Sequence, residues 1–516
     1  MNGAEKLITS AIDCGIEICF ANAGTTEMPI LLALDRIKGI KAVLGLFEGV
    51  CTGAADGYGR MSGNPAMTLL HLGPGFANGI ANLHNARRAH TPILNVIGEH
   101  ATWHRPADPP LAMDIEGLAK TVSEWTRTNT LTEDIPHDVA KAVEAASTGR
   151  IASLIVPHDH QLNPCDAKRT IPSGTPFAPV EDGEIEEATG LLRTRPKIAL
   201  FLGGRALRRE GLAIAARIQG LTGCDLLTEN FPTMVERGAG LPVVARVPYF
   251  PEEARALLSI YEGVILAGAK EPVTFFGYPG TNSRILRDDQ MKVTIGTGRQ
   301  DILEALAQLA DALKGPTGRP LRERVVSEIH RPGIPHGELT PLKVSQTLAA
   351  LQPEGAIIVE EGLTTSFEYY PLTAAIPPHT ILPITGGAIG YGMPCAVGAA
   401  LACPDRPVID FQADGSAMYT IQALWTQARE DLNVTTLLCS NHSYRILQAE
   451  LERAGIERPG KNAQALTELK EPTIDWVKIA EGFGVPAVSV KEVSELADAV
   501  RRSLMEPGPS LVEMKL

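Results

Sequence analysis

Residues 408–451, VIDFQADGSAMYTIQALWTQAREDLNVTTLLCSNHSYRILQAEL, decide the fold. The apolar runs VIDFQ and VTTLLCS predict two short strands, and the segment between them predicts a helix. Strands that alternate with helices form parallel sheets, so the carboxyl ends of these strands share one edge. Asp414 and Asn441 each follow a strand, and we therefore expect both at that edge.

The residues that follow the first strand suit a phosphate and a cation. Carboxylate, amide and loop carbonyl oxygens are ligands for a magnesium ion that bridges phosphates. Gly415 lets the backbone approach a phosphate, and the helix start at Ser416 adds amide donors. Each piece alone is also typical of a helix cap or a turn.

Similar alternation of strands and helices fills the rest of the chain, which at 516 residues is too long for one core. Stretches rich in Pro, Gly and charge at 163–184 and 315–340 predict linkers. We predict an α/β protein with three doubly wound parallel-sheet domains. These domains cover residues 1–165, 185–315 and 340–516.

Composition excludes several classes of protein. The net charge of −13 argues against nucleic-acid binding, which requires clustered Lys and Arg. No stretch approaches the ~20 apolar residues of a membrane span, and the N-terminus lacks the order of a signal peptide. The eight scattered cysteines predict reduced, buried thiols. We expect a cytoplasmic enzyme without a membrane or nucleic-acid partner.

The Asp-Gly-Ser run and the strand-ending Asn together resemble the cofactor motif of thiamine diphosphate-dependent enzymes of the acetolactate synthase and benzoylformate decarboxylase type. The resemblance implies thiamine diphosphate and Mg²⁺ as cofactors. It makes the N-terminal domain pyrimidine-binding and the C-terminal domain diphosphate-binding. The implied metal ligands are Asp414, Asn441 and the carbonyl of Ser443, and the implied diphosphate contacts include Gly415 and Ser416.

The motif departs from the family at two positions. Ala413 and Ser440 stand where the family has a Gly and an Asn. These departures concern the phosphate loop and leave the implied metal ligands intact.

Two blocks upstream extend the resemblance. In TGGAIGYGMPCAVGAALACPDRPV, residues 385–408, it implies that the Gly387 carbonyl and the Ile389 amide hold the aminopyrimidine ring. The Ile389 side chain then forces the cofactor into its bent shape. In EEGLTTS, residues 360–366, Thr364 and Thr365 are implied phosphate ligands.

The N-terminal domain contains LGLFEGVCTGAADGYGRMSGNPA, residues 44–66. An isolated Glu at such a helix start is usually solvated. The pattern instead resembles the family's activating glutamate, which makes Glu48 the residue that bonds the pyrimidine N1′ and promotes formation of the ylide. In the family this residue meets the metal-binding Asp across a subunit interface, so the resemblance implies a homodimer or homotetramer.

Two further loops bear on the substrate. FANAGTTEMP, residues 20–29, resembles the substrate loop of benzoylformate decarboxylase, with Thr25 at the contacting position. LLHLGPGFANG, residues 69–79, places His71 at that enzyme's first active-site His. An imidazole there can shuttle protons near neutral pH.

The reaction stays open between three hypotheses. We favour a lyase that decarboxylates 2-oxoacids and also carries carboligase activity. The Gly-Pro-Gly at 73–75 instead resembles acetolactate synthases, so a transferase that needs an aldehyde or acyl acceptor, or a 2-hydroxyacyl-CoA lyase, is an alternative. FAD in the central domain is allowed by GGRALRREG, residues 203–211, but is not favoured, and the chain ends after SLVEMKL without the extension of the synthases. A non-catalytic homologue is disfavoured by the intact Glu48, Asp414 and Asn441.

Overall fold

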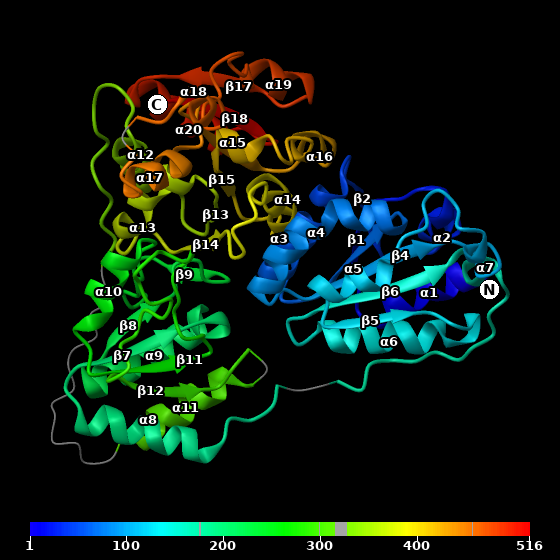
Figure 1. The fold of residues 1–516 in the computed structure, drawn as a ribbon, viewed down its shortest axis with the longest axis horizontal. Helices are drawn as coiled ribbons and strands as arrows, with labels where there is room; N and C mark the ends of the chain where they lie inside the picture. Colours follow the sequence, from blue (N-terminus) through cyan, green and yellow to red (C-terminus); the bar gives the residue numbers. More distant parts are fainter. Residues whose placement is uncertain (175–176, 299, 315–327, 457) are drawn as a thin grey trace. The chain divides into compact units, whose positions relative to one another are not determined.

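A computed structural model describes residues 1–174, 177–298, 300–314, 328–456 and 458–516. The chain divides into two compact units (Figure 1). Unit 1 comprises Met1–Thr175, Pro332–Tyr369 and Ile384–Leu516, and unit 2 comprises Pro176–Arg331 and Tyr370–Pro383. The predicted domain boundary at residue 315 and the first part of the predicted linker, 315–327, lie outside the described residues.

The N-terminal part of unit 1 is built on a six-stranded sheet in which every pairing is parallel. The strands lie in the order β2-β1-β3-β4-β6-β5. Their bounds are β1 (Ile18–Asn22), β2 (Lys41–Leu44), β3 (Ala66–Leu70), β4 (Ile93–Glu99), β5 (Trp125–Thr128) and β6 (Ile151–Pro157). β3, β4 and β6 are buried along their whole length, as expected of strands covered on both faces.

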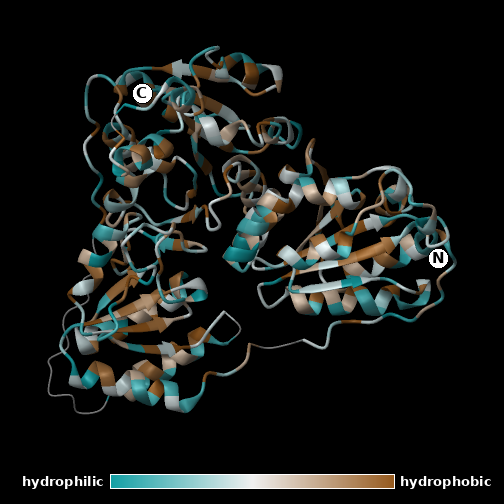
Figure 2. Ribbon diagram, in the orientation of Figure 1, coloured by the Kyte–Doolittle hydropathy of each residue, from teal (hydrophilic) through white to brown (hydrophobic). Residues whose placement is uncertain are grey.

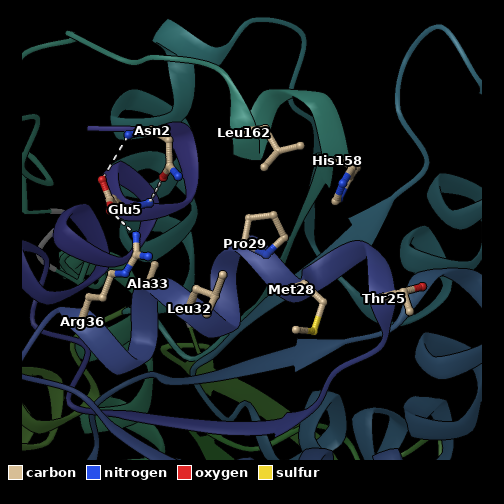
Figure 3. Close-up of a pocket in the computed structure, with 10 residues that line it drawn as sticks. All are labelled: Asn2, Glu5, Thr25, Met28, Pro29, Leu32, Ala33, Arg36, His158 and Leu162. Carbon is tan, nitrogen blue, oxygen red and sulfur yellow. Dashed lines mark hydrogen bonds and ion pairs between the residues drawn. The ribbon is translucent and has the colours of Figure 1, made fainter.

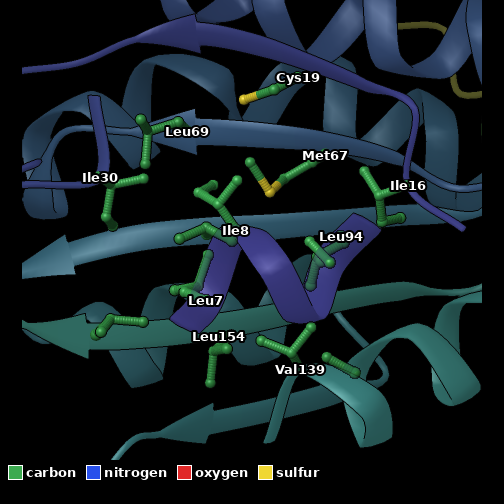
Figure 4. Close-up of a cluster of buried hydrophobic side chains, with 14 of the residues drawn as sticks. Leu7, Ile8, Ile16, Cys19, Ile30, Met67, Leu69, Leu94, Val139 and Leu154 are labelled. Carbon is green, nitrogen blue, oxygen red and sulfur yellow. The ribbon is translucent and has the colours of Figure 1, made fainter. Parts of the chain in front are cut away.

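Helices cover this sheet in two sets (Figure 1): α1 contacts both α2 and α6, and α4 contacts both α3 and α5. Apolar side chains of α1 and α6 pack on the central strands, where Leu7, Met67 and Val139 belong to one buried cluster (Figure 4). The helices are α1 (Gly3–Asp13), α2 (Met28–Arg36), α3 (Glu48–Ser62), α4 (Leu72–Ala89), α5 (Ile115–Val122), α6 (Ile135–Ala146) and α7 (His158–Leu162).

The C-terminal part of unit 1 contributes five parallel strands in the order β17-β18-β16-β15-β13. The strands are β13 (Ile357–Glu360), β15 (Val408–Ala413), β16 (Val434–Ser440), β17 (Ala487–Val490) and β18 (Ser510–Lys515). The helices are α12 (Pro341–Leu351), α14 (Gly392–Ala402), α15 (Asp414–Ala417), α16 (Ala423–Arg429), α17 (Arg445–Arg453), α18 (Lys461–Ala465), α19 (Trp476–Gly482) and α20 (Val493–Met505). β15 and β16 are neighbours, so Asp414 and Asn441 follow adjacent strands, as predicted.

Helices α3 and α14 pack closely within unit 1 because small residues line their contact. A Cβ added at Gly398 would overlap the carbonyl oxygen of Ala54, and one at Gly57 would overlap that of Cys395. The ion pair between Arg60 and Asp56, at 2.5 Å, is buried beside this contact.

Unit 2 holds a second all-parallel sheet in the order β10-β8-β7-β11-β12, with an antiparallel pair of β9 and β14. The strands are β7 (Ile198–Leu202), β8 (Asp225–Thr228), β9 (Val235–Arg237), β10 (Ala245–Arg246), β11 (Gly263–Ala267), β12 (Met291–Ile295) and β14 (His379–Pro383). The helices are α8 (Asp182–Thr194), α9 (Arg209–Thr222), α10 (Pro251–Ser259) and α11 (Ile302–Ala312), and α13 (Tyr369–Leu372) begins at the last residue of the middle segment of unit 1.

The predicted α/β class with doubly wound parallel sheets is confirmed. Figure 2 shows hydrophobic residues concentrated in the strands and mixed with hydrophilic ones along the helices, as this architecture requires. Each predicted domain contains one parallel sheet, but the three-domain boundaries stay a prediction. No helix among the described residues is long and apolar enough to cross a membrane.

Candidate functional site

Glu48 is the first residue of α3 and is only 9% exposed. Its Oε2 accepts a hydrogen bond of 3.0 Å from Asn78 Nδ2 of α4. The preceding residue, Phe47, has an extended backbone and makes no side-chain cap, and Glu48 lies in the first turn, where the helix dipole favours a negative charge. Glu48 is therefore a buried carboxylate held in place by one amide side chain.

His71 lies at the end of β3, immediately before α4. Its Nδ1 lies 2.7 Å from Oε2 of Glu27 and 3.3 Å from Oγ1 of Thr26. The His71 side chain is 21% exposed, while that of Glu27 is fully buried. One edge of the imidazole is thus bound to a carboxylate.

The structure brings Glu48 and His71 together around one glycine. A Cβ added at Gly75 would lie 2.8 Å from Oε1 of Glu48 and 3.1 Å from Cβ of His71. A side chain at position 75 would therefore press on the Glu48 carboxylate and on His71. The Gly-Pro-Gly run therefore has a packing reason independent of any family resemblance.

Thr25 begins the short 3-10 helix Thr25–Glu27 and is exposed. The contacts with His71 come from its neighbours Thr26 and Glu27, which the sequence analysis did not single out. Thr25 instead lines a cavity of about 370 Å³ with His158 and the apolar residues of α2 (Figure 3). Arg36, paired with Glu5, lies at the other end of this cavity.

Asp414 is 2% exposed, and its two oxygens accept backbone amides. Oδ1 accepts from Gly415 at 2.8 Å, and Oδ2 accepts from His442 at 2.7 Å. Asn441 Oδ1 accepts from the amide of Ser443 at 3.0 Å. The bond to His442 ties Asp414 to the loop that contains Asn441 and Ser443, so the three predicted metal ligands gather in one place.

These residues fit a hard divalent cation. The donor set is a carboxylate, an amide oxygen and a backbone carbonyl, which are oxygen ligands that magnesium accepts. Burial raises the pKa of Asp414, while the amides of Gly415 and His442 act in the opposite direction. A cation would favour the charged carboxylate in the same position. Among the described residues there is no cluster of three or more His, Cys, Asp or Glu side chains suited to a metal.

The predicted diphosphate contacts follow two neighbouring strands, β15 and β13. Gly415 and Ser416 open α15, and a Cβ at Gly415 would overlap the ring of Tyr444. Thr364 and Thr365 belong to the 3-10 helix Leu363–Glu368, where Thr365 is buried and Thr364 is half-buried. The two threonines thus follow β13, the strand next to β15.

The predicted pyrimidine loop has a distinctive backbone. Gly387 has a φ of 73°, in the left-handed region, and Ile389 is half-buried. Asn85 of α4 clamps the residue between them, because its Nδ2 donates to the Ala388 carbonyl at 2.7 Å and its Oδ1 accepts the Ala388 amide at 3.2 Å. Asn82 donates to the carbonyl of Gly390 at 3.2 Å. The loop is therefore held by the helix that begins after His71.

Glu361 anchors the far end of the same loop and was not predicted. It is fully buried and accepts the amides of Gly390, Tyr391 and Gly392 at 2.8, 3.1 and 2.6 Å. Burial raises its pKa, and the three amides oppose that shift. Nothing in the run EEGLTTS signals this contact, since the partners are backbone groups 29 to 31 residues away.

Two family patterns match the chain. One described as "Thiamine pyrophosphate enzyme, N-terminal TPP binding domain" matches residues 1–120. The other, "Thiamine pyrophosphate enzyme, C-terminal TPP binding domain", matches residues 363–514. Glu48 and His71 lie in the first region, and the Asp414 loop lies in the second.

Several whole proteins are similar along their entire length. The chain is 46% identical to the "Putative acetolactate synthase large subunit IlvX" of Mycobacterium tuberculosis, over 100% of this chain and 99% of the relative. It is 27% identical to a benzoylformate decarboxylase of Pseudomonas aeruginosa, over 97% and 96% of the two chains. The fold matches that of a thiamine diphosphate-dependent 4-hydroxybenzoylformate decarboxylase of Rhodococcus jostii RHA1 with a TM-score of 0.86 and 23% identity, over 99% and 98% of the chains.

Proposed function

We propose that this chain, which belongs to the family of thiamine pyrophosphate enzymes, decarboxylates a 2-oxoacid and releases an aldehyde. The observation that carries the proposal is the pairing of a buried Glu48 with His71 around Gly75. Glu48 follows β2 and His71 follows β3, so both residues lie at the carboxyl edge of the first sheet, where ligands of parallel sheets bind. The reaction needs both groups, one to activate a cofactor and one to move protons.

When bound, thiamine diphosphate supplies the nucleophilic carbon and the electron sink that such a cleavage needs. Glu48 would hold the proton that the aminopyrimidine exchanges, at Oε1, because Oε2 is already occupied by Asn78. Gly387 and Ile389 would hold the aminopyrimidine ring. Asp414, Asn441 and the Ser443 carbonyl would hold Mg²⁺.

The diphosphate would lie near the two short helices after β13 and β15. Thr364 and Thr365 would donate hydroxyl hydrogen bonds, and Gly415 and Ser416 would offer backbone amides. Glu361 would keep the pyrimidine loop in shape through the amides of 390–392. In these roles the residues only bind the cofactor or position the loops around it.

His71 would serve as the acid and base for the reacting carbonyl group. Its ring is 21% exposed, so the edge away from Glu27 can reach a ligand. Thr25 would contact the substrate from the loop that also holds Glu27. The substrate would be a small 2-oxoacid, and an aldehyde or acyl group is the candidate second substrate. We also propose that the chain acts in the cytoplasm as a homodimer or homotetramer, with Glu48 and Asp414 meeting across the subunit interface.

A second candidate function is an acetolactate synthase-like transfer to a second substrate. The observation that favours it is the 46% identity to a relative with that name over the whole chain. In that case turnover would require an acceptor, and FAD would be a candidate cofactor. A 2-hydroxyacyl-CoA lyase differs in its substrate and falls under the same test.

The test is to quantify carbon dioxide and carbon products from a panel of 2-oxoacids, with and without aldehyde acceptors. Wild-type enzyme loaded with thiamine diphosphate and Mg²⁺ should release carbon dioxide from a single 2-oxoacid. Turnover only with an acceptor, or flavin absorbance in the purified protein, would favour the synthase instead.

The matched variants are E48Q and E116Q. Both carboxylates lie in the first turn of a helix, but Glu116 is exposed and distant in the sequence from the predicted site residues. E48Q should lower cofactor-dependent turnover roughly 10²- to 10⁴-fold, as expected for loss of an acid-base group. E116Q should leave it unchanged, and full activity of E48Q would overturn the proposal.

A further inference from the structure

Glu27 is a buried carboxylate with three hydrogen-bonding partners. Its side chain is 0% exposed. Oε2 accepts the amide of Gly24 at 2.9 Å and lies 2.7 Å from Nδ1 of His71, while Oε1 lies 2.6 Å from the hydroxyl of Thr26. A buried carboxylate is stable only when hydrogen-bonded in this way.

The surroundings of Glu27 leave no room for another arrangement. A Cβ added at Gly98 of β4 would overlap Oε1 of Glu27, and one at Gly24 would overlap the His71 ring. The backbone at Gly98 thus packs directly against the Glu27 side chain, and the backbone at Gly24 packs against the His71 ring. Glu27 and His71 are therefore fixed by backbone on both sides, with little freedom to change rotamer.

The backbone beside His71 is also unusual. Leu72, the next residue, is fully buried and has a φ of 50°, in the left-handed region that a Leu rarely adopts. Such a conformation persists only where the surrounding structure enforces it, and it concentrates at functional sites. This strained turn lies immediately after His71.

The hydrogen bonds determine where the imidazole carries its proton. An amide N–H only donates, so Oε2 of Glu27 acts as an acceptor toward Gly24. An ionised carboxylate has no hydrogen to donate, so with Glu27 ionised the donor in the short contact is Nδ1 of His71. Nε2 remains the ring nitrogen that can take up or deliver a proton at the partly exposed edge.

We propose that Glu27 is the positioning residue of His71, holding its Nδ1–H tautomer and orientation so that Nε2 alone exchanges protons with the substrate. The arrangement has the logic of a carboxylate that orients an imidazole base in hydrolases. Thr26 restrains the carboxylate from its other oxygen. The inference rests on the role of His71 in the proposed function.

The test compares E27Q and E27A with D138N. Asp138 is a matched control because it is also a fully buried carboxylate of unit 1, accepting from Asn129 at 2.8 Å and pairing with Arg127. Both Glu27 variants should lower kcat roughly 10- to 100-fold with KM within about threefold, E27A more than E27Q. D138N should leave kcat unchanged, although its melting temperature falls.

A spectroscopic measurement distinguishes the positioning of His71 from a purely structural role of Glu27, because a structural role would not change the tautomer of His71. Long-range ¹H–¹⁵N correlation of the holoenzyme labelled with ¹⁵N-histidine reports the tautomer of each ring, and H71N identifies the His71 signal. The wild-type enzyme and D138N should show Nδ1–H, and E27A should lose that single form.

Two results would overturn the inference. One is an Nε2–H tautomer of His71 in the wild type, and the other is a kcat for E27A equal to that of D138N. The proposed function is tested separately: full activity of E48Q would reject it, whatever the His71 spectrum shows. An inactive E48Q together with an Nε2–H spectrum rejects the role of Glu27 alone.

Discussion

The two halves of the candidate site are held by different kinds of bond. In the N-terminal half, side chains hold side chains, as in the pairs Glu27–His71 and Glu48–Asn78. In the C-terminal half, carboxylates hold mainly the backbone, as Asp414 does with two amides and Glu361 with three, and one side chain, Gln412, also donates to Glu361. The first arrangement fixes the position and protonation of groups that can react. The second fixes the shape of loops that can bind.

Because of this difference, substitutions in the two halves should impair different properties of the enzyme. Substitutions in the N-terminal half should remove turnover and leave cofactor binding intact. Substitutions in the C-terminal half should weaken cofactor binding first.

The largest expected effect comes from H71A. Loss of the imidazole should lower kcat roughly 10²- to 10⁴-fold, because it removes the group proposed to move protons to and from the substrate. Thiamine diphosphate affinity should be unchanged. Steady-state kinetics and calorimetric titration check both parts, and a weakened affinity would contradict the division between the halves.

Replacing Gly398 with Ala should destabilise the packing of α14 on α3 within one chain. The added Cβ would overlap the Ala54 carbonyl of α3, so α3 and α14 must separate. We expect a loss of about 1–3 kcal/mol, the usual cost of overpacking, seen as a lower melting temperature. G183A is the control, since Gly183 lies in α8 with nothing within 4 Å of an added Cβ. Equal melting temperatures of G398A and G183A would show that α3 and α14 can separate without loss of stability.

Replacing Gly387 with Ala should affect binding more than stability. Its φ of 73° costs an Ala about 1–2 kcal/mol, and the loop should relax away from the shape that holds the aminopyrimidine. The control is G455A, which has a similar φ of 78° and an open surrounding. Both variants should lose similar stability in denaturant titration, but G387A alone should bind thiamine diphosphate more weakly.

The smallest effect is expected for D410N, and it depends on pH. Asp410 is fully buried, and burial followed by the charge of Glu361 raises its pKa well above the ordinary value. A folded-state pKa above the unfolded value means that stability falls as pH rises between the two. D410N removes this dependence, so the melting temperature of D410N should rise relative to that of the wild type between pH 5 and pH 8. A constant difference across this range would show that Asp410 does not titrate on unfolding.

The sequence alone was enough to predict the strands that position the C-terminal half of the candidate site. VIDFQ and VTTLLCS became β15 and β16, and their adjacency brought Asp414 to Asn441 because parallel strands share an edge. Glu48 and His71 were predicted from resemblance, and no spacing rule places them around Gly75. The WTRT strand β5 was missed because it is half-polar and half-buried, and so lacks the alternation of a core strand.

The supporting carboxylates were missed for a different reason. Glu27 stands within the quoted FANAGTTEMP, but a Glu before a helix is ordinarily a solvated dipole partner. Its burial depends on Gly98, which reaches it from a strand 71 residues later. Glu361 binds backbone amides, which leave no residue type to recognise. Contacts of this kind are set by tertiary packing, which a local pattern does not encode.

The most direct test of the central claim is a titration of thiamine diphosphate, with Mg²⁺ present, into the wild type, E48Q and D414N. We expect E48Q to bind the cofactor like the wild type but not to turn over. We expect D414N, without its anionic metal ligand, to bind the cofactor at least about 100-fold more weakly. Wild-type affinity of D414N would contradict the assignment of the Asp414 loop as the site that holds the metal and the cofactor.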